Sequence, residues 1–206
     1  MPMNVENGMI DFYFDFMSPF AYLAQRRLPE LAARYGYGIV YKPFDLPLAK
    51  KAAGNFGPSN REVPAKLRYL TADMNRWAAR YGVPLKFPSS FASQRMNIGT
   101  FYAQERNKAQ DYVTAAYGRA WSSGDDMSDT EVLAGLAREM KWDESEFVDF
   151  IDSPEGVKRF EAANLEAHSR GVFGAPTMLI GDDMWWGNDR LDFLEEFLKQ
   201  KSDKAA

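Results

Sequence analysis

An alternating apolar segment near the start of the chain runs directly into a helix start. Residues 10–16 read IDFYFDF, and apolar side chains at every second position predict a β-strand. Ser18 and Pro19 follow, and proline suits the first helical position because its φ is fixed and its missing N–H would be unpaired there. We therefore expect Ser18 to be the N-cap of a helix. Its hydroxyl would lie beside free backbone N–H groups, which favour a bound anion such as a thiolate.

A second strand is predicted soon after this helix. Apolar residues recur on one face from residue 19 to about residue 35, and the helix is expected to end at Gly36. Residues 38–44, GIVYKPF, then have the composition of a strand. Two strands joined by a helix indicate a parallel βαβ unit, because parallel strands need a crossover connection.

The middle of the chain changes character to helices. From residue 46 to residue 170 the sequence shows no convincing strand and no repeat, and Gly, Pro and Ser separate helical stretches. The clearest helix carries apolar side chains at spacings of three and four, ends at Gly82, and is expected to face the core. These side chains are Leu67, Leu70, Met74, Trp77 and Tyr81. Further helices are predicted over residues 94–106, 109–121, 129–140, 145–151 and 154–168.

The α/β pattern returns near the end of the chain. Residues 176–180 and 184–186 are predicted to form a hairpin across a Gly-Asp-Asp turn. A final amphipathic helix follows, and Asn188 is its expected cap. Pro176 is a natural place for a cis peptide bond, which would turn the backbone of Ala175 toward a bound ligand.

This order of elements predicts an α/β protein with a thioredoxin-like fold that a helical domain interrupts in the middle. The thioredoxin-like domain is expected to be discontinuous, over residues 9–45 and 171–201, and the inserted helical domain to cover residues 46–170. A chain of 206 residues is long enough to bury the core of one large domain or of a domain with an insertion.

The composition excludes several classes of protein. The chain has no cysteine, so it has no disulfide, no thiolate metal site and no thiol of its own. Its single histidine, His168, argues against a Ser-His-Asp triad and against a multi-histidine metal centre, so no metal is predicted. A net charge of −4 with both signs scattered indicates no nucleic-acid partner. No apolar run could span a membrane and the polar N-terminus lacks a signal peptide, so we expect a cytoplasmic protein.

Four segments together carry a family resemblance. The segments DFYFDFMSPFAYL, GNFGPSNREVPAKLRYL, SQRMNIG and GVFGAPTMLIGDDMWWGNDRL resemble the bacterial 2-hydroxychromene-2-carboxylate isomerases over residues 9–198. They resemble more distantly the kappa-class glutathione transferases and the Dsb-type oxidoreductases. The resemblance implies an interrupted thioredoxin-like fold, glutathione as cofactor and a homodimer. It also implies a step of naphthalene breakdown that interconverts 2-hydroxychromene-2-carboxylate and trans-o-hydroxybenzylidenepyruvate, small aromatic carboxylates, by thiolate addition, bond rotation and elimination.

The resemblance also implies roles for individual residues. Ser18 would be the catalytic residue, whose hydroxyl stabilises the thiolate of glutathione. Glutathione would further contact Ala175, Trp186, Gly187, Asn188 and Asp189. The substrate would contact Lys50, Asn60, Arg61 and Phe91. The chain departs from the family at Phe91, where tyrosine is expected, and at Ala175, where valine is more usual.

Simpler interpretations of the same residues are also open. Ser18 taken alone is more often just an N-cap, Asn188 and Asp189 also suit a helix start, and Lys50 and Arg61 would by default be solvated surface charges. Two other functions are open as well. One is a kappa-like glutathione transferase or peroxidase, and the other is a noncatalytic thioredoxin-like binding module.

Overall fold

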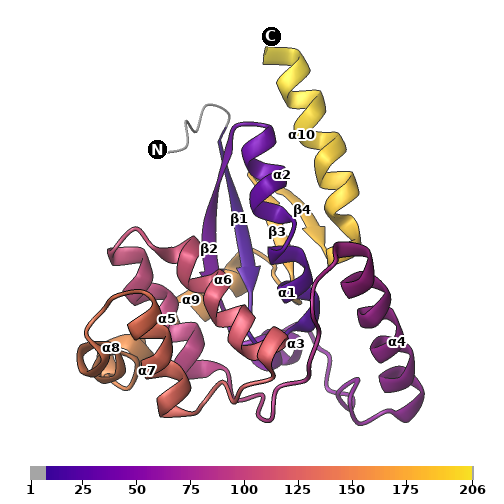
Figure 1. Ribbon diagram of the computed structural model, residues 1–206. Coiled ribbons are helices and arrows are strands. Elements are labelled where there is room, and N and C mark those ends of the chain that lie inside the picture. Colours follow the sequence, from indigo (N-terminus) through magenta and orange to yellow (C-terminus); the bar gives the residue numbers. More distant parts are fainter. Residues whose placement is uncertain (1–7, 206) are drawn as a thin grey trace.

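Four strands form one sheet in the part of the chain that the computed structural model describes, residues 8–205. Residues 1–7, which hold most of the polar N-terminal segment considered above, lie outside the described residues. The strands are β1 (Gly8–Phe14), β2 (Tyr37–Pro43), β3 (Thr177–Ile180) and β4 (Asp183–Trp186), in the spatial order β2-β1-β3-β4 (Figure 1). The pair β1 and β2 is parallel, and the other two pairs are antiparallel. The predicted βαβ unit and the predicted hairpin are confirmed.

The connection between β1 and β2 consists of two short helices, so the single helix predicted over residues 19–35 is wrong. Helix α1 spans Pro19–Gln25 and helix α2 spans Leu28–Arg34. Pro29 lies in the first turn of α2, where its missing N–H costs nothing. Inside one continuous helix it would remove a hydrogen bond and clash with the preceding turn.

The described chain between β2 and β3 is helical, as predicted. Its α-helices are α3 (Leu46–Ala52), α4 (Pro64–Tyr81), α5 (Gln94–Glu105), α6 (Ala109–Tyr117), α7 (Thr130–Glu139), α8 (Glu144–Ile151) and α9 (Pro154–Ser169). Helix α3 was not predicted, although Asp45 caps it by accepting a hydrogen bond from the Leu48 N–H. The helix predicted over residues 109–121 is wrong at its end, because a π-helical turn, η1 (Gly118–Ser123), follows α6.

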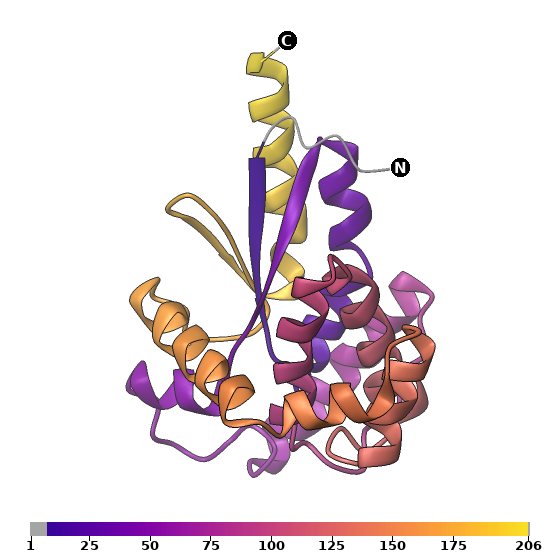
Figure 2. The same ribbon diagram turned by 90° about the vertical axis from the view of Figure 1, so that its left-hand side faces the viewer.

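The side chains of β1 point alternately to the two faces of the sheet. Ile10, Phe12 and Phe14 are fully buried in a core shared with α1, α2 and the C-terminal helix α10 (Leu191–Ala205). Tyr13 packs on the other face with side chains of α3 and α9. Figure 2 shows α2 and α9 on opposite sides of the two parallel strands. The first core continues into α5, α6, α7 and α8, and the division of the chain into two domains stays a prediction.

The apolar stripe of α4 is not the core element that the sequence predicts. Met74 is buried, but Leu67 is exposed and the three other side chains of the stripe are only partly buried. Leu67, Leu70 and Met74 line a large cavity, so the stripe faces a pocket as well as the core. The predicted end of the helix is confirmed, because Gly82 closes it with a φ of 64° in the left-handed region.

Candidate active site

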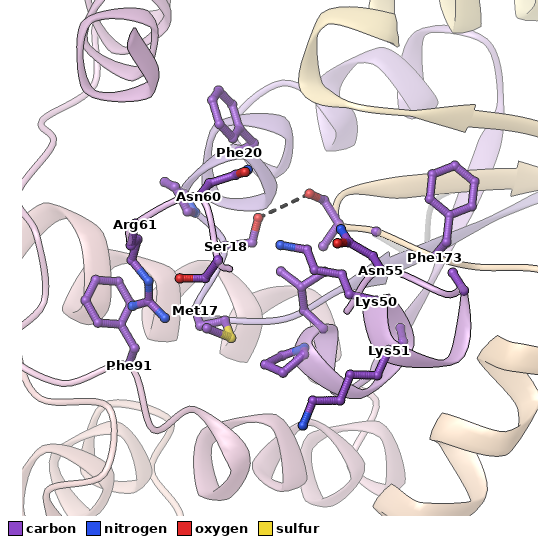
Figure 3. A pocket seen from close by; sticks show the side chains of 18 of the residues that line it. Met17, Ser18, Phe20, Lys50, Lys51, Asn55, Asn60, Arg61, Phe91 and Phe173 are labelled. Carbon is purple, nitrogen blue, oxygen red and sulfur yellow. Dashed lines mark hydrogen bonds between the residues drawn. The ribbon is translucent and has the colours of Figure 1, made fainter. Parts of the chain in front are cut away.

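A cavity of about 1120 Å³ lies beside the C-terminal end of β1. Its walls come mainly from the β1–α1 turn, α3, the segment between α3 and α4, α4 itself, and the loop that precedes β3, with further side chains from the segment between α4 and α5, η1, the end of α9 and β4. Figure 3 shows several of these side chains pointing into the same space. Of the residues predicted for the site, the cavity wall contains Ser18, Lys50, Asn60, Arg61, Phe91, Ala175 and Trp186.

Ser18 is the N-cap of α1, as the sequence predicts. Its Oγ accepts a hydrogen bond from the Ala21 N–H at 3.3 Å and donates one to the Ala175 carbonyl oxygen at 3.3 Å. Both bonds are long, so the hydroxyl is available to donate to a ligand atom instead. Because α1 has only seven residues, the hydroxyl and the nearby cations would contribute more to the stabilisation of a bound anion than the helix dipole would.

The turn that carries Ser18 is held by the buried carboxylate of Asp15, a role that no local sequence pattern indicates. The carboxylate accepts hydrogen bonds from the Met17 N–H, the Leu46 N–H, the Ser93 hydroxyl and the Asn97 amide. Burial raises the pKa of Asp15, and the hydrogen bonds from Ser93 and Asn97 act in the opposite direction. The Ser18 N–H closes the turn by donating to the Asp15 carbonyl oxygen at 2.9 Å.

The loop before β3 brings the backbone of Ala175 to Ser18. The peptide bond between Ala175 and Pro176 is cis, as predicted. The Ala175 carbonyl accepts the Ser18 hydroxyl, and the Ala175 N–H donates no hydrogen bond to a described residue. Gly174 is needed beside it because a Cβ there would collide with the indole nitrogen of Trp186. Trp186 itself is half exposed in the cavity wall.

Lys50 extends from α3 toward Ser18 (Figure 3). Burial lowers the pKa of Lys50, and the positive charge of Arg61 lowers it further, whereas Asp15 raises it. Neither Lys50 nor Arg61 forms an ion pair with another described residue. Two cations that lack a paired carboxylate suit a cavity for an anionic ligand.

Arg61 stacks on Phe91 in the same cavity. The guanidinium carbon lies 4.0 Å from the centroid of the Phe91 ring (Figure 3), which is a cation–π contact. Stacking on its flat face leaves the N–H groups at the edge of the guanidinium free to bind a carboxylate through two hydrogen bonds. Asn60, the residue before Arg61, is exposed and also lines the cavity.

Much of the remaining wall is apolar or aromatic. Its side chains include Phe20, Leu67, Leu70, Met74, Phe87 and Trp121. The Trp121 ring lies 6.0 Å from the Phe91 ring, centroid to centroid, and its Nε1 donates to the Phe16 carbonyl oxygen at 2.7 Å. The sequence indicated Trp121 only as a helix residue. An aromatic wall beside cationic groups suits a flat aromatic carboxylate.

Gly187, Asn188 and Asp189 are outside the cavity wall. Asn188 begins a short 3₁₀ turn, η2 (Asn188–Arg190), and makes no capping bond, so its predicted role as a cap is wrong. It is only 2% exposed, and neither its side-chain nitrogen nor its oxygen has a well-formed hydrogen bond to a described residue. The Tyr81 hydroxyl is a polar neighbour of this amide, because burial raises the pKa of Tyr81 and the Asn188 side chain acts in the opposite direction. A buried amide without a well-formed hydrogen bond is costly.

The chain is similar to known proteins over nearly its whole length. The family model for the DSBA-like thioredoxin domain matches residues 9–199, which confirms the predicted thioredoxin-like fold. The 2-hydroxychromene-2-carboxylate isomerase of Sphingobium xenophagum is 52% identical over 189 residues, which cover 92% of this chain and 97% of that protein. The chain belongs to the 2-hydroxychromene-2-carboxylate isomerase family. The resemblance inferred from its sequence motifs is thereby confirmed.

A solved structure and a more distant relative are also similar to this chain over most of its length. A solved structure of a 2-hydroxychromene-2-carboxylate isomerase matches it with a TM-score of 0.90 and 44% sequence identity, covering 93% of this chain and 95% of that chain. Glutathione S-transferase kappa 2 of Caenorhabditis elegans is 26% identical over 209 residues, which cover 93% of this chain and 92% of that protein.

None of the helices in residues 8–205 has both the length and the apolar character that a membrane crossing requires. Likewise, residues 8–205 contain no cluster of His, Asp or Glu side chains placed to hold a metal ion.

Proposed function

We propose that this protein is a glutathione-dependent isomerase that interconverts 2-hydroxychromene-2-carboxylate and trans-o-hydroxybenzylidenepyruvate in the breakdown of naphthalene or related aromatic compounds. The observation that carries the proposal is one cavity that joins the Ser18 hydroxyl, the cations Lys50 and Arg61, and an aromatic wall. The relative at 52% identity carries the name of this activity, which supports the same reaction here.

Several features of the chain fit glutathione. The backbone N–H and carbonyl of Ala175 are available to pair with an extended peptide, and Trp186 lies beside them in the cavity wall. The Asn188 amide, which lacks a well-formed hydrogen bond, suits the carboxylate of a γ-glutamyl group, and the Asp189 carboxylate, which also pairs with Arg190 at 2.8 Å, suits its ammonium. Gly187 has a φ of 114°, and a Cβ there would meet the Asp189 side chain, so this segment keeps its shape only with glycine.

The residues of the cavity then have distinct tasks. When bound, glutathione supplies a thiolate that adds reversibly to the conjugated double bond of the substrate and so permits rotation. Ser18 donates its hydroxyl hydrogen to the sulfur and favours the ionised thiol. The charged ends of Lys50 and Arg61, with the Asn60 amide, hold the substrate carboxylate, and they stabilise negative charge that develops on the neighbouring oxygen.

The aromatic wall orients the ring of the substrate. Phe91 lines the cavity and the fully buried Trp121 packs behind it, so a substrate ring would gain burial and ring contacts against this supported wall. Because this chain has Phe91 where tyrosine is expected, the ring would lose one hydroxyl partner. We therefore propose that Phe91 alters the preference for ring substituents without altering the reaction.

A direct assay tests the proposed function. Purified protein and glutathione are mixed with each of the two carboxylates in turn, and the approach to equilibrium is followed by absorbance and chromatography. We expect the same final ratio from both directions, reached much faster than without protein. Absence of catalysed interconversion would contradict the proposal.

A kappa-like glutathione transferase or peroxidase is the second candidate, and the relative at 26% identity favours it. Conjugation of a chlorinated arene, or reduction of a hydroperoxide, without isomerisation would support this alternative. Failure to bind glutathione in calorimetry, together with inactivity in every assay, would instead support a noncatalytic binding module.

We also propose that the protein is a homodimer in the cytoplasm. The family resemblance supports the dimer, and the cytoplasmic location is carried over from the sequence analysis. Light scattering on the purified protein, with an expected mass twice that of one chain, tests the first, and cell fractionation tests the second.

A further inference from the structure

We propose that Asp15 is a positioning residue that places the Ser18 hydroxyl and the Lys50 ammonium relative to each other. Its carboxylate accepts hydrogen bonds from both segments that carry these groups, the turn before α1 and the start of α3. The inference rests on the proposed function, because it concerns the two groups assigned there to the thiol and to the substrate. Asp15 does not line the cavity, so it acts through other residues.

The first half of the argument is the turn that leads to Ser18. One carboxylate oxygen of Asp15 accepts the Met17 N–H at 3.1 Å, and the Asp15 carbonyl accepts the Ser18 N–H at 2.9 Å. The Tyr117 hydroxyl donates to the same carbonyl at 3.1 Å. Asp15 therefore fixes the backbone on both sides of Met17, and this fixes the direction in which the Ser18 side chain leaves the turn.

The second half is the start of α3. The other carboxylate oxygen of Asp15 accepts the N–H of Leu46, the first residue of α3, at 3.0 Å. Lys50 lies four residues further along, which is about one helical turn. A shift of the helix start would therefore move the Lys50 side chain within the cavity.

The start of α5 completes the arrangement. The Ser93 hydroxyl and the Asn97 amide both donate to the Asp15 carboxylate, and the Asn97 side-chain oxygen accepts the Phe16 N–H at 3.2 Å. Every partner of the carboxylate is a donor, so an ionised carboxylate satisfies all of them. An amide in its place would turn an N–H₂ group toward at least one of these donors and push it away.

The test compares Asp15→Asn with Tyr13→Phe. Tyr13 lies in β1, two residues before Asp15, and its hydroxyl donates to Glu166 at 2.6 Å. Neither Tyr13 nor Glu166 lines the cavity, so this control removes a hydrogen bond of β1 without changing the cavity wall. Crystal structures of both variants without ligand show whether the groups move. We expect the Ser18 side chain and the start of α3 to shift in Asp15→Asn and to stay in place in Tyr13→Phe.

The ionisation of bound glutathione gives a second readout, measured by thiolate absorbance against pH without substrate. Loss of the Asp15 charge alone would lower the pKa of the thiol, whereas a displaced Ser18 hydroxyl would raise it. We expect a rise of about one unit in Asp15→Asn, and no rise when Ser18→Ala is already present, because both changes would remove the same interaction. If Asp15→Asn does not fold, Ser93→Ala, which keeps the charge, should give a smaller shift in the same direction.

Different results overturn different parts of the account. An unmoved Ser18 and α3 in Asp15→Asn, or an unchanged or lowered thiol pKa, would overturn the role of Asp15. A wild-type protein that neither binds glutathione nor isomerises the carboxylates would overturn the proposed function instead. The crystal structures of the ligand-free variants would then decide the role of Asp15 by themselves.

Discussion

The chain has two helices that begin with Ser-Pro, and only one of them lies at the cavity. Ser153 and Pro154 start α9, where the Ser153 hydroxyl accepts the Gly156 N–H at 3.0 Å and donates to the Phe150 carbonyl at 2.7 Å. Ser18 makes the same kind of capping bond at the start of α1, but it donates to Ala175, which is 157 positions away.

The difference lies in what the rest of the fold brings to each hydroxyl. Ser153 has short bonds within its own turn and is absent from the cavity wall. Ser18 has two long bonds and faces Lys50 inside the cavity. An identical local pattern is therefore structural in one place and fits catalysis in the other, because only tertiary contacts supply a pocket, a cation and a second backbone segment.

Replacing the two serines gives the largest expected contrast. We expect Ser18→Ala to lower kcat of the isomerisation by about 10²-fold or more, the size of effect seen when one donor to a developing charge is removed. Ser153→Ala should leave kcat unchanged and cost about 1 kcal/mol of folding free energy. Steady-state kinetics and urea unfolding measure the two effects. Equal losses of kcat in the two variants would contradict the different roles assigned to Ser18 and Ser153.

We expect a similar contrast in kcat/KM between Arg61, which lines the same cavity as Ser18, and Arg95, which lies near Ser153. Arg61 lies in the cavity, whereas Arg95 forms a two-bond ion pair with Asp152, the residue before Ser153. Arg61→Ala should lower kcat/KM by about 10-fold, because a charged hydrogen bond to the carboxylate is lost. Arg95→Ala should change kcat/KM by less than about 2-fold, since Arg95 lies outside the cavity wall and its surface ion pair contributes little to stability. A loss with Arg95→Ala that matches Arg61→Ala would contradict the assignment of Arg61.

The dependence of KM on pH tests whether the charged form of Lys50 binds the substrate carboxylate. Burial and the charge of Arg61 lower the pKa of Lys50 from its ordinary value, so the ammonium loses its proton at a lower pH than an exposed lysine does. If the charged form binds the carboxylate as proposed, KM should rise as the pH increases through this lowered pKa. In Lys50→Arg, which stays charged, the rise should disappear. A KM that rises equally in both proteins would exclude Lys50 as its cause.

The smallest expected effect concerns the ring pocket. Phe91→Tyr restores the hydroxyl expected in the family while it keeps the ring on which Arg61 stacks. We expect kcat for the parent carboxylate to change by less than about 3-fold and the ratio of kcat/KM between ring-substituted analogues to change more, since one hydrogen bond contributes about 1 kcal/mol. Identical ratios in the two proteins would show that position 91 does not select the ring.

Local patterns predicted the parts of the fold that local physics determines. The alternation over residues 10–16 gave β1, and Gly82 marked the end of α4. The broken helix after Ser18 was also visible in the sequence, because Pro29 is incompatible with a helix interior. The prediction of one helix over residues 19–35 is wrong because it leaves Pro29 in the interior of that helix.

Other features depend on contacts that no short pattern contains. The Asp15 carboxylate finds its partners 31, 78 and 82 positions away, at Leu46, Ser93 and Asn97. The stripe of α4 has the spacing of a core helix, yet Leu67 faces the cavity, since periodicity identifies an apolar face without saying what covers it. The candidate residues Lys50, Asn60 and Arg61 were named through family resemblance, and their meeting in one cavity became visible only in the fold.

The most direct measurement is the dependence of activity on a small thiol. Protein freed of thiols by gel filtration is assayed alone, with glutathione, and with S-methylglutathione, which keeps the peptide but has no ionisable sulfur. The account predicts isomerisation only in the presence of glutathione. Full activity in the thiol-free protein, or equal activity with S-methylglutathione, would contradict the central claim that this cysteine-free chain works through the sulfur of a bound tripeptide.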